Sequence, residues 1–304
     1  MKEQKNEIYT RIDEDFILKF KPKHRNYMKK LYYDFYSEFC VHYKRKPLTK
    51  DEFYSNMHRR RIQLYQLCCP YCGTVEIIPV DKKLHIEMFK YCPNCGRGST
   101  FDNLFKQVSR FIRIEGINRI GLKEFKKEHM DTEEWVLGYD CYQMEIIELA
   151  SIIEVVFRDC FEALLCINNF GTEDSHNAYI KKTLKRYYNN DFMNIEKANN
   201  IFKKAYEINI KEKLDNDTWF ALIDIVALRN MMVHNNGNID EHFKSTSTYK
   251  RLQNHIVGNL FKLESKDIAH YLDVVIKAVT DISDLYLEKY YSLRNSAIAN
   301  FYFN

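Results

Sequence analysis

The sequence predicts a mainly α-helical protein, and three observations support this fold class. Glycine and proline are scarce, with 9 and 5 copies among 304 residues, which disfavours many-stranded β-sandwiches and glycine-rich nucleotide-binding folds. Beyond residue 140, apolar residues recur at spacings of three and four over long stretches, as in amphipathic helices. Hydrophobic residues make up 45% of the chain, enough to form a packed core, which excludes a disordered or low-complexity protein.

The length of the chain predicts more than one domain, and its charge distribution predicts that the two halves have different binding partners. The chain is about twice the usual domain size. Residues 1–135 carry a net charge of +8 and residues 136–304 a net charge of −4. The basic front half indicates nucleic acid as a partner, although a Lys-, Asn-, Ile- and Tyr-rich composition also arises from an AT-rich genome. No apolar run approaches the roughly 18 residues that cross a bilayer, and the charged start lacks a signal-peptide core, so we expect a soluble, cytoplasmic protein with no membrane partner.

The first predicted part is a basic, aromatic-rich helical region over residues 1–66. Phe35 and Phe39, with Tyr32 a turn before, form an apolar stripe on one helix, and Thr49 with Glu52 is a capping box that opens the next. The basic run 58–61 follows. Aromatic residues interleaved with basic ones can stack on bases and bind phosphates. The alternative is a packed core with a solvated rim.

The second part, residues 67–100, has the pattern of a zinc ribbon. The strings CPYCG and CPNCG, at 69–73 and 92–96, each place two thiolates on a tight turn, and two such turns complete a tetrahedral site for Zn²⁺. All four positions are filled by cysteine, so we expect a structural metal. Cys68 is a bystander or, in a shifted register, replaces Cys69. The predicted metal ligands are Cys69, Cys72, Cys92 and Cys95, and the remaining cysteines Cys40, Cys141, Cys160 and Cys166 are expected to fill apolar core positions.

Residues 101–139 have an irregular pattern punctuated by glycine, which predicts a connector with one short helix or strand. From residue 140 to 304 the pattern predicts a helical bundle. Glu154 and Arg158 are expected to form an i, i+4 ion pair on its first helix. The predicted bundle helices cover about 141–168, 175–188, 195–210, 217–234 and 265–290.

A polar motif interrupts the fourth bundle helix where it ends, in Arg229-Asn230-Met-Met-Val-His234 followed by Asn-Asn-Gly. Asn230 and His234 are about 40° apart around an ideal helix and share a face, whereas Arg229 is about 140° from His234. Arg229 must therefore reach round the helix, or two copies of the motif meet across a dimer.

The motif has a chemical and a structural interpretation. A histidine can exchange a proton with a ribose 2′-hydroxyl or a leaving 5′-oxygen, an arginine fork suits the charge on a phosphate in its transition state, and an asparagine can orient either group. The structural interpretation is that the helix dipole favours Arg and His near a C-terminus and that Asn-Gly ends the helix.

Arg229-Asn230-x-x-x-His234, followed by the string NNG, resembles the RNxxxH form of the R-x4–6-H motif of the HEPN superfamily. The resemblance covers about residues 140–295 and implies a HEPN-like helical bundle that forms a homodimer. It also implies a metal-independent endoribonuclease, typical of toxin-like effectors in prokaryotic antiviral defence by abortive infection, that leaves a cyclic phosphate. Carried over to this chain, His234 is the general acid and base, Arg229 stabilises the transition state, and Asn230 positions them. No cofactor is expected for catalysis, and a constitutive ribonuclease implies a regulator or trigger protein.

Two other functions are compatible with the sequence. The protein could be a non-catalytic RNA- or protein-binding regulator that uses the zinc ribbon and the helical bundle. It could also be a zinc-ribbon DNA-binding regulator with a helical dimerisation domain, for which strong duplex binding with a steep salt dependence is expected. The intact set of Arg229, Asn230 and His234 favours the enzyme, because a pure binder has no need of all three.

Overall fold

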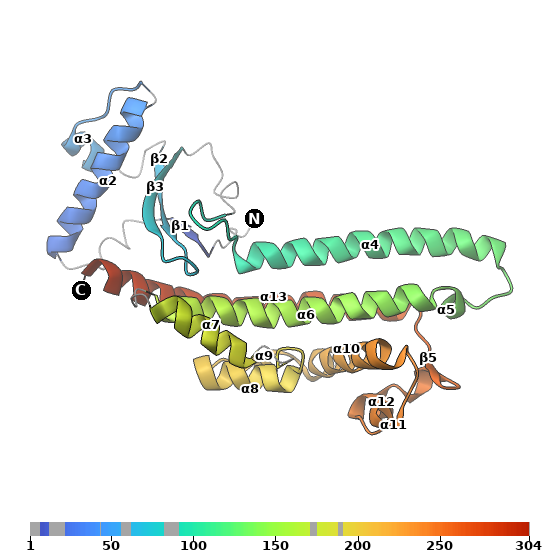
Figure 1. The fold of residues 1–304 in the computed structure, drawn as a ribbon. Coiled ribbons are helices and arrows are strands. Elements are labelled where there is room, and N and C mark those ends of the chain that lie inside the picture. The colour runs from blue at the N-terminus through green and yellow to red at the C-terminus, as the bar shows by residue number, and fades with distance from the viewer. Residues whose placement is uncertain are drawn as a thin grey trace. The chain divides into compact units, whose positions relative to one another are not determined.

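The structure is a computed structural model that describes residues 7–11, 22–42, 44–55, 62–81, 91–170, 175–187 and 191–303. Within these residues it is mainly helical, as predicted, with two small sheets (Figure 1). The chain divides into two compact units. Unit 1 comprises residues 1–102, 166–176 and 290–304, and unit 2 comprises residues 103–165 and 177–289. None of the described helices combines the length and the apolar character that crossing a membrane requires.

Unit 1 contains a three-stranded antiparallel sheet in the order β1-β2-β3. Its strands are β1 (Tyr9–Arg11), β2 (Ile62–Cys68) and β3 (Val75–Asp81). Tyr9 lies opposite Leu67, and both side chains are buried together with Ile8. The start of β2 and all of β1 fall inside the predicted helical region 1–66. The difference has a structural cause: β2 is the central strand of the sheet, paired on both sides, and its residues Tyr65, Gln66, Leu67 and Cys68 are all buried.

The helices α2 (Pro22–His42) and α3 (Lys50–Ser55) also belong to unit 1. Tyr36, Cys40 and Phe53 form a small buried cluster between them. The predicted capping box is confirmed: Glu52 Oε2 accepts a hydrogen bond from Thr49 N at 2.9 Å, and Glu52 N donates to Thr49 Oγ1 at 3.4 Å. The basic run 58–61 and the side chains of Tyr32, Phe35 and Phe39 lie outside the described residues.

Segments from both ends of the chain complete unit 1. Tyr290 Oη donates a hydrogen bond to the carbonyl oxygen of Glu7 at 3.2 Å. Arg294 Nη2 donates to the carbonyl oxygen of Gln66, also at 3.2 Å. Both Tyr290 and Arg294 are buried. Because these bonds satisfy buried carbonyl groups, the sheet of unit 1 depends on the last part of the chain as well as on the first.

The predicted connector is instead a long helix, α4 (Thr100–Glu128), followed by a single turn, α5 (Glu134–Leu137). Gly116 and Gly121 lie inside α4 without ending it, and a glycine in a helix costs only about 1 kcal/mol relative to alanine. The loop between the two helices is held by Lys126, whose ammonium group donates to the carbonyl oxygens of Met130 and Thr132.

The remaining helices of the bundle agree with the predicted ones at their starts to within about two residues, and the last continues beyond the predicted end. The elements are α6 (Tyr139–Asn168), α7 (Ser175–Tyr187), α8 (Ile195–Tyr206), α9 (Ile210–Lys213), α10 (Asn216–Asn235), α11 (Glu241–Lys244), α12 (Ser247–Arg251), a 3₁₀ turn (Gln253–His255), the hairpin β4 (Ile256–Val257) and β5 (Leu260–Phe261), and α13 (Ser265–Phe303).

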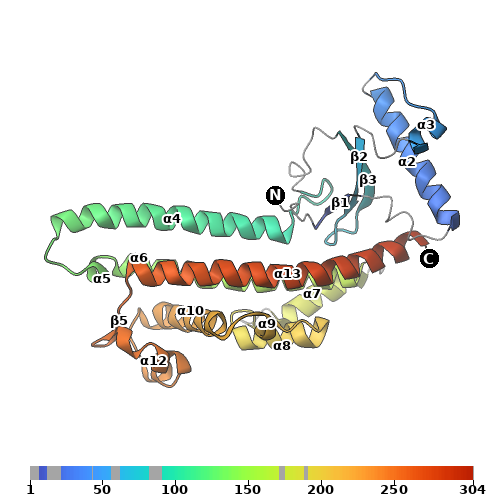
Figure 2. The same cartoon turned by 180° about the vertical axis from the view of Figure 1, so that it is seen from behind.

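Within unit 2, α4, α6 and α13 run side by side, and α10 lies along the bundle on the other side of α6 and α13 from α4 (Figures 1 and 2). The core is aromatic where α6 meets α8: the rings of Phe157 and Phe161 lie 6.1 and 5.8 Å from that of Phe202. The helix α10 begins at the N-cap Asp215, whose carboxylate accepts a hydrogen bond from Thr218 N at 2.7 Å.

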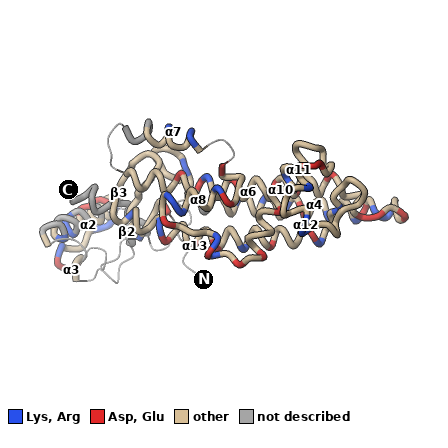
Figure 3. The backbone as a smooth tube through the Cα atoms, turned by 90° about the horizontal axis from the view of Figure 1, so that it is seen from below, with Lys and Arg blue, Asp and Glu red and all other residues tan. Residues whose placement is uncertain are grey.

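Charged residues of both signs are mixed along the long helices of unit 2, whereas α7 carries only basic ones, the exposed Lys181, Lys182, Lys185 and Arg186 (Figure 3). The net charge of −4 over residues 136–304 therefore does not describe each helix of unit 2.

Candidate functional site

Unit 1 brings the four predicted ligand cysteines together. The sulfur atoms of Cys69, Cys72, Cys92 and Cys95 all lie within 4.8 Å of one another. Cys69 Sγ is 3.6 Å from Cys95 Sγ, and Cys72 Sγ is 3.7 Å from Cys92 Sγ. Four sulfurs about 2.3 Å from a tetrahedral zinc ion lie roughly 3.8 Å apart, so the donor set and its spacing fit such an ion.

The backbone of the two cysteine turns explains why each is followed by glycine. Gly73 N donates to the carbonyl oxygen of Cys69 at 3.0 Å, and Gly96 N donates to that of Cys92 at 2.9 Å. Gly73 and Gly96 have φ angles of 74° and 70°, in the left-handed region that residues other than glycine rarely adopt. The two turns are therefore equivalent, and each presents its two sulfurs to the same point.

The structure also decides the role of Cys68. It is the last residue of β2, is fully buried, and lies outside the sulfur cluster, which contains Cys69 instead. Successive residues of a strand face opposite ways, so Cys68 points into unit 1. The expected core positions of Cys40, Cys160 and Cys166 are confirmed by their burial, whereas Cys141 is half-buried.

Unit 2 brings the three residues of the polar motif to one cavity. Arg229, Asn230 and His234 all lie on the last turns of α10 and line a cavity of about 600 Å³. Arg229 Nη1 donates a hydrogen bond to Asn230 Oδ1 at 3.0 Å. This bond directs the arginine side chain toward Asn230, the residue expected to share a helix face with His234.

The Arg229 side chain has unused hydrogen-bonding capacity. Its Nε atom is buried and has no hydrogen-bond partner among the described residues. A buried donor without an acceptor is costly, and in native proteins such groups often mark a place where a ligand or water completes the bonding. His234 and Asn230 are exposed, Arg229 is half-buried, and all three line the cavity, so a ligand there would lie beside each of them.

Other elements contribute residues that the sequence pattern did not indicate. Lys197 of α8 and His242 of α11 line the same cavity. Asp240 also lines it, and its carboxylate accepts hydrogen bonds from Phe243 N at 2.7 Å and from Asn235 Nδ2 at 2.6 Å. The first of these bonds lowers the pKa of Asp240, which therefore keeps a negative charge near His242.

The turn after α10 is fixed against α6. Asn236 and Gly237 both adopt left-handed φ angles, 50° and 77°, which end the helix directly after His234 and Asn235. Tyr139 Oη of α6 donates to the carbonyl oxygen of Gly237 at 3.5 Å.

The expected ion pair between Glu154 and Arg158 is present at 3.8 Å, and neither residue lines the cavity.

Comparison with known proteins adds no relative: no family model, no curated protein and no solved structure matches the chain. Membership of the HEPN superfamily therefore remains a prediction based on the motif.

Proposed function

We propose that the protein is a metal-independent endoribonuclease of the HEPN type, acting in the cytoplasm as a toxin-like effector of antiviral defence. The observation that carries the proposal is the cavity on α10. It combines a histidine, an asparagine bonded to an arginine, and a buried arginine Nε without a partner among the described residues. These groups supply proton transfer and stabilisation of charge on a phosphate, the two requirements for cleaving RNA through its own 2′-hydroxyl.

The reaction needs no external nucleophile. His234 takes the proton of the ribose 2′-hydroxyl, whose oxygen attacks the adjacent phosphorus. Arg229, which is held in place by its hydrogen bond to Asn230, stabilises the additional negative charge on the phosphate oxygens. The bond between phosphorus and the 5′-oxygen breaks, and the leaving oxygen takes a proton from a protonated imidazole. The products are a 2′,3′-cyclic phosphate and a 5′-hydroxyl end.

Residues from neighbouring elements suit an RNA chain in the same cavity. Lys197 offers a cation to a phosphate next to the one that is cut, and His242 offers a second imidazole. Phosphate contacts of this kind position a nucleic acid without selecting its sequence. A homodimer through the bundle would bring two such cavities together, and a regulator or trigger protein would restrain them.

In unit 1 the metal is proposed to be Zn²⁺ with a structural role. Four cysteine sulfurs supply all the ligands of a tetrahedral ion and leave no position for a reactive water. The ion would fix the second cysteine turn to the first, which forms the loop of the β2–β3 hairpin. The proposed metal thus stabilises unit 1 and takes no part in RNA cleavage, which is assigned to the cavity in unit 2.

The test is cleavage of total cellular RNA by the purified full-length protein, with EDTA added only when the reaction starts. The wild type is compared with Arg229→Ala and His234→Ala. The matched control is His270→Ala, an exposed histidine of α13 that does not line the cavity. Loss of a general acid or base lowers the rate by about 10²–10⁴-fold, so both cavity variants should be nearly inactive while the control keeps its activity.

End-group analysis completes the test. Cyclic phosphate ends that form in excess EDTA support the proposed chemistry. Cleavage that persists in His234→Ala, or that stops whenever EDTA is present, contradicts it. RNA binding by all four proteins with no cleavage by any of them supports the alternative, a non-catalytic regulator.

A further inference from the structure

A second, smaller cavity lies in unit 2 between α4, α6 and the start of α13. Its volume is about 260 Å³, and Leu122, Tyr142 and Ile268 supply its apolar lining. Pockets that hold a whole drug-sized ligand measure about 300–1,000 Å³. This cavity therefore suits a compact ligand.

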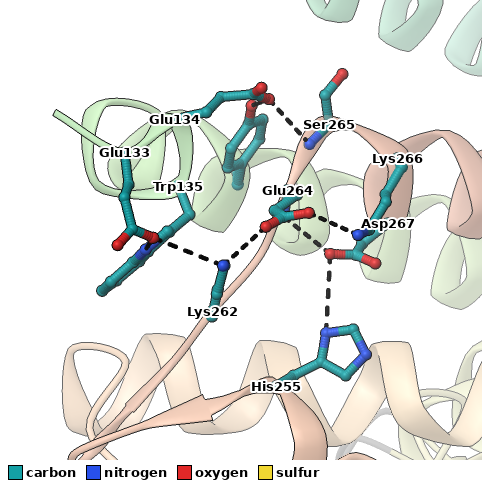
Figure 4. A network of polar contacts seen from close by, with 10 residues as sticks. Glu133, Glu134, Trp135, His255, Lys262, Glu264, Ser265, Lys266 and Asp267 are labelled. Carbon is teal, nitrogen blue, oxygen red and sulfur yellow. Dashed lines mark hydrogen bonds and ion pairs between the residues drawn. The ribbon is translucent and has the colours of Figure 1, made fainter. Parts of the chain in front are cut away.

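Most of the charged groups around this cavity already have partners. Arg119 pairs with Glu115 at 3.7 Å, and Lys126 is bound to the carbonyl oxygens of the α4–α5 loop. The carboxylate of Glu134 accepts hydrogen bonds from Tyr142 Oη at 2.7 Å and from Ser265 N at 3.4 Å (Figure 4). These groups shape the cavity and hold α5 and α13 at its edge.

Two charged groups of opposite sign remain. Glu145 is only 3% exposed, and its Oε1 accepts one hydrogen bond, from Asn118 Nδ2 at 2.8 Å. Among the described residues, its second oxygen has no donor and no cation pairs with it. Lys123, an exposed residue of α4, forms no ion pair within the described part of the chain. Both line the cavity, one as a buried carboxylate and the other as an accessible ammonium group.

We propose that this cavity binds a small zwitterion with an organic cation at one end and a carboxylate at the other, the chemistry of free arginine. The guanidinium fork would pair with Glu145, the methylene stem would lie against Leu122 and Ile268, and the ligand carboxylate would meet Lys123. A guanidinium group is planar, matches a carboxylate with two parallel hydrogen bonds, and is more weakly hydrated than an ammonium, so it is the cation best suited to a buried partner.

The state of Glu145 supports this choice. Burial, with a smaller contribution from the negative charge of Glu115, raises its pKa to about 6, so above that pH the carboxylate is ionised at a buried position where no described cation pairs with it. A ligand cation would offset this cost, and arginine should bind more tightly as the pH rises through 6. An anionic or neutral ligand would leave the buried charge uncompensated.

The test is isothermal titration calorimetry of the full-length protein with three matched probes. L-arginine carries both charged ends, citrulline replaces the guanidinium with a neutral urea of the same shape, and agmatine lacks the carboxylate. All three carry an ammonium group at the end opposite the guanidinium or urea, so the comparison isolates the guanidinium and the carboxylate. We expect arginine to bind at one site per chain. Citrulline and agmatine should each bind at least about tenfold more weakly, since each loses one charge-assisted contact.

Variants assign each end of the ligand. Glu145→Gln keeps the shape and the acceptor for Asn118, and should remove the preference for arginine over citrulline. Lys123→Ala should remove the preference for arginine over agmatine. Arg113→Ala, an exposed cation of α4 away from this cavity, and Arg229→Ala, in the α10 cavity, should leave binding unchanged. Far-UV circular dichroism checks that each variant is folded.

Three results would overturn the proposal: no saturable binding of arginine, equal affinity for citrulline, or unchanged arginine binding by folded Glu145→Gln. Loss of binding in Arg229→Ala would instead assign the ligand to the α10 cavity and would equally refute the site proposed here. None of these measurements uses RNA cleavage, so their outcome is independent of the proposed ribonuclease activity.

Discussion

Replacing Glu145 with glutamine should make unit 2 more stable at neutral and alkaline pH. The residue lies on α6 with 3% of its surface exposed and accepts one hydrogen bond, from Asn118. A glutamine has nearly the same shape and can accept the same bond through its carbonyl oxygen. The substitution therefore removes a buried charge and leaves the packing in place.

The magnitude follows from the pKa. Burial, with a smaller contribution from the nearby Glu115, raises the pKa of Glu145 from 4.5 to about 6. Ionising the carboxylate in the folded protein thus costs about 2 kcal/mol more than in the unfolded chain. Because the pKa of Glu145 is higher in the folded protein than in the unfolded chain, the protonated carboxyl contributes stability to the wild type. This contribution is fully present below pH 4.5 and is lost as the pH rises through 6. Of this loss, about 1 kcal/mol falls between pH 5 and pH 8.

The assay is urea denaturation followed by tryptophan fluorescence. Both tryptophans of the chain, Trp135 and Trp219, lie in unit 2, so the signal reports on the unit that contains Glu145. The free energy of unfolding of the variant minus that of the wild type should increase by about 1 kcal/mol from pH 5 to pH 8. Glu148→Gln, which removes a half-buried carboxylate of α6 that pairs with Arg110, serves as the control and should show no such increase.

Two results would refute this reasoning. If Glu145→Gln is less stable than the wild type at pH 8, then the ionised carboxylate makes favourable contacts that outweigh its burial. If the difference between the two proteins does not change with pH, then Glu145 has an ordinary pKa and is solvated in solution.

Three further predictions concern the metal and the packing of unit 2. Cys72→Ser should abolish binding of one metal ion per chain, measured by a colorimetric chelator after thiol modification, whereas Cys68→Ser should retain it. Asp215→Ala removes the N-cap of α10 and should lower the urea midpoint of unit 2; Asp215→Asn, which caps equally well, should restore most of it. Arg251→Ala leaves the buried carboxylate of Asp224 without its cation and should cost about 3 kcal/mol in urea denaturation, and adding Asp224→Asn should recover part of that loss.

The metal ligands could be identified from the sequence because the information is local. Each pair of cysteines lies on one turn, and the glycine after it is required by the turn itself. The assignment of Cys69 rather than Cys68 needed the structure, because it depends on where β2 ends. The long helices of the bundle were also predictable, because apolar residues recur along them at spacings of three and four over several turns.

Other features could not be predicted, and the reasons are physical. The helix α4 carries apolar residues around much of its circumference, including the exposed Ile117 and Ile120, so it lacks the periodicity of an amphipathic helix. Lys197 and His242 reach the α10 cavity from other helices, and no spacing along the chain relates them to His234. Glu145 is an acidic residue on an amphipathic helix, and only the packing of α4 against it makes it a buried charge.

The composition of unit 1 from three distant stretches has a consequence for synthesis of the protein. Tyr290 and Arg294 bond to the backbone of Glu7 and Gln66, so the metal-binding unit is closed by residues 283 and 228 positions apart in the sequence. Residue 294 must therefore be synthesised before both of these closing bonds can form. A fragment containing residues 67–100 alone lacks these closing bonds. A premature stop codon before residue 290 should thus damage the metal-binding unit, more than 190 residues upstream of the lesion.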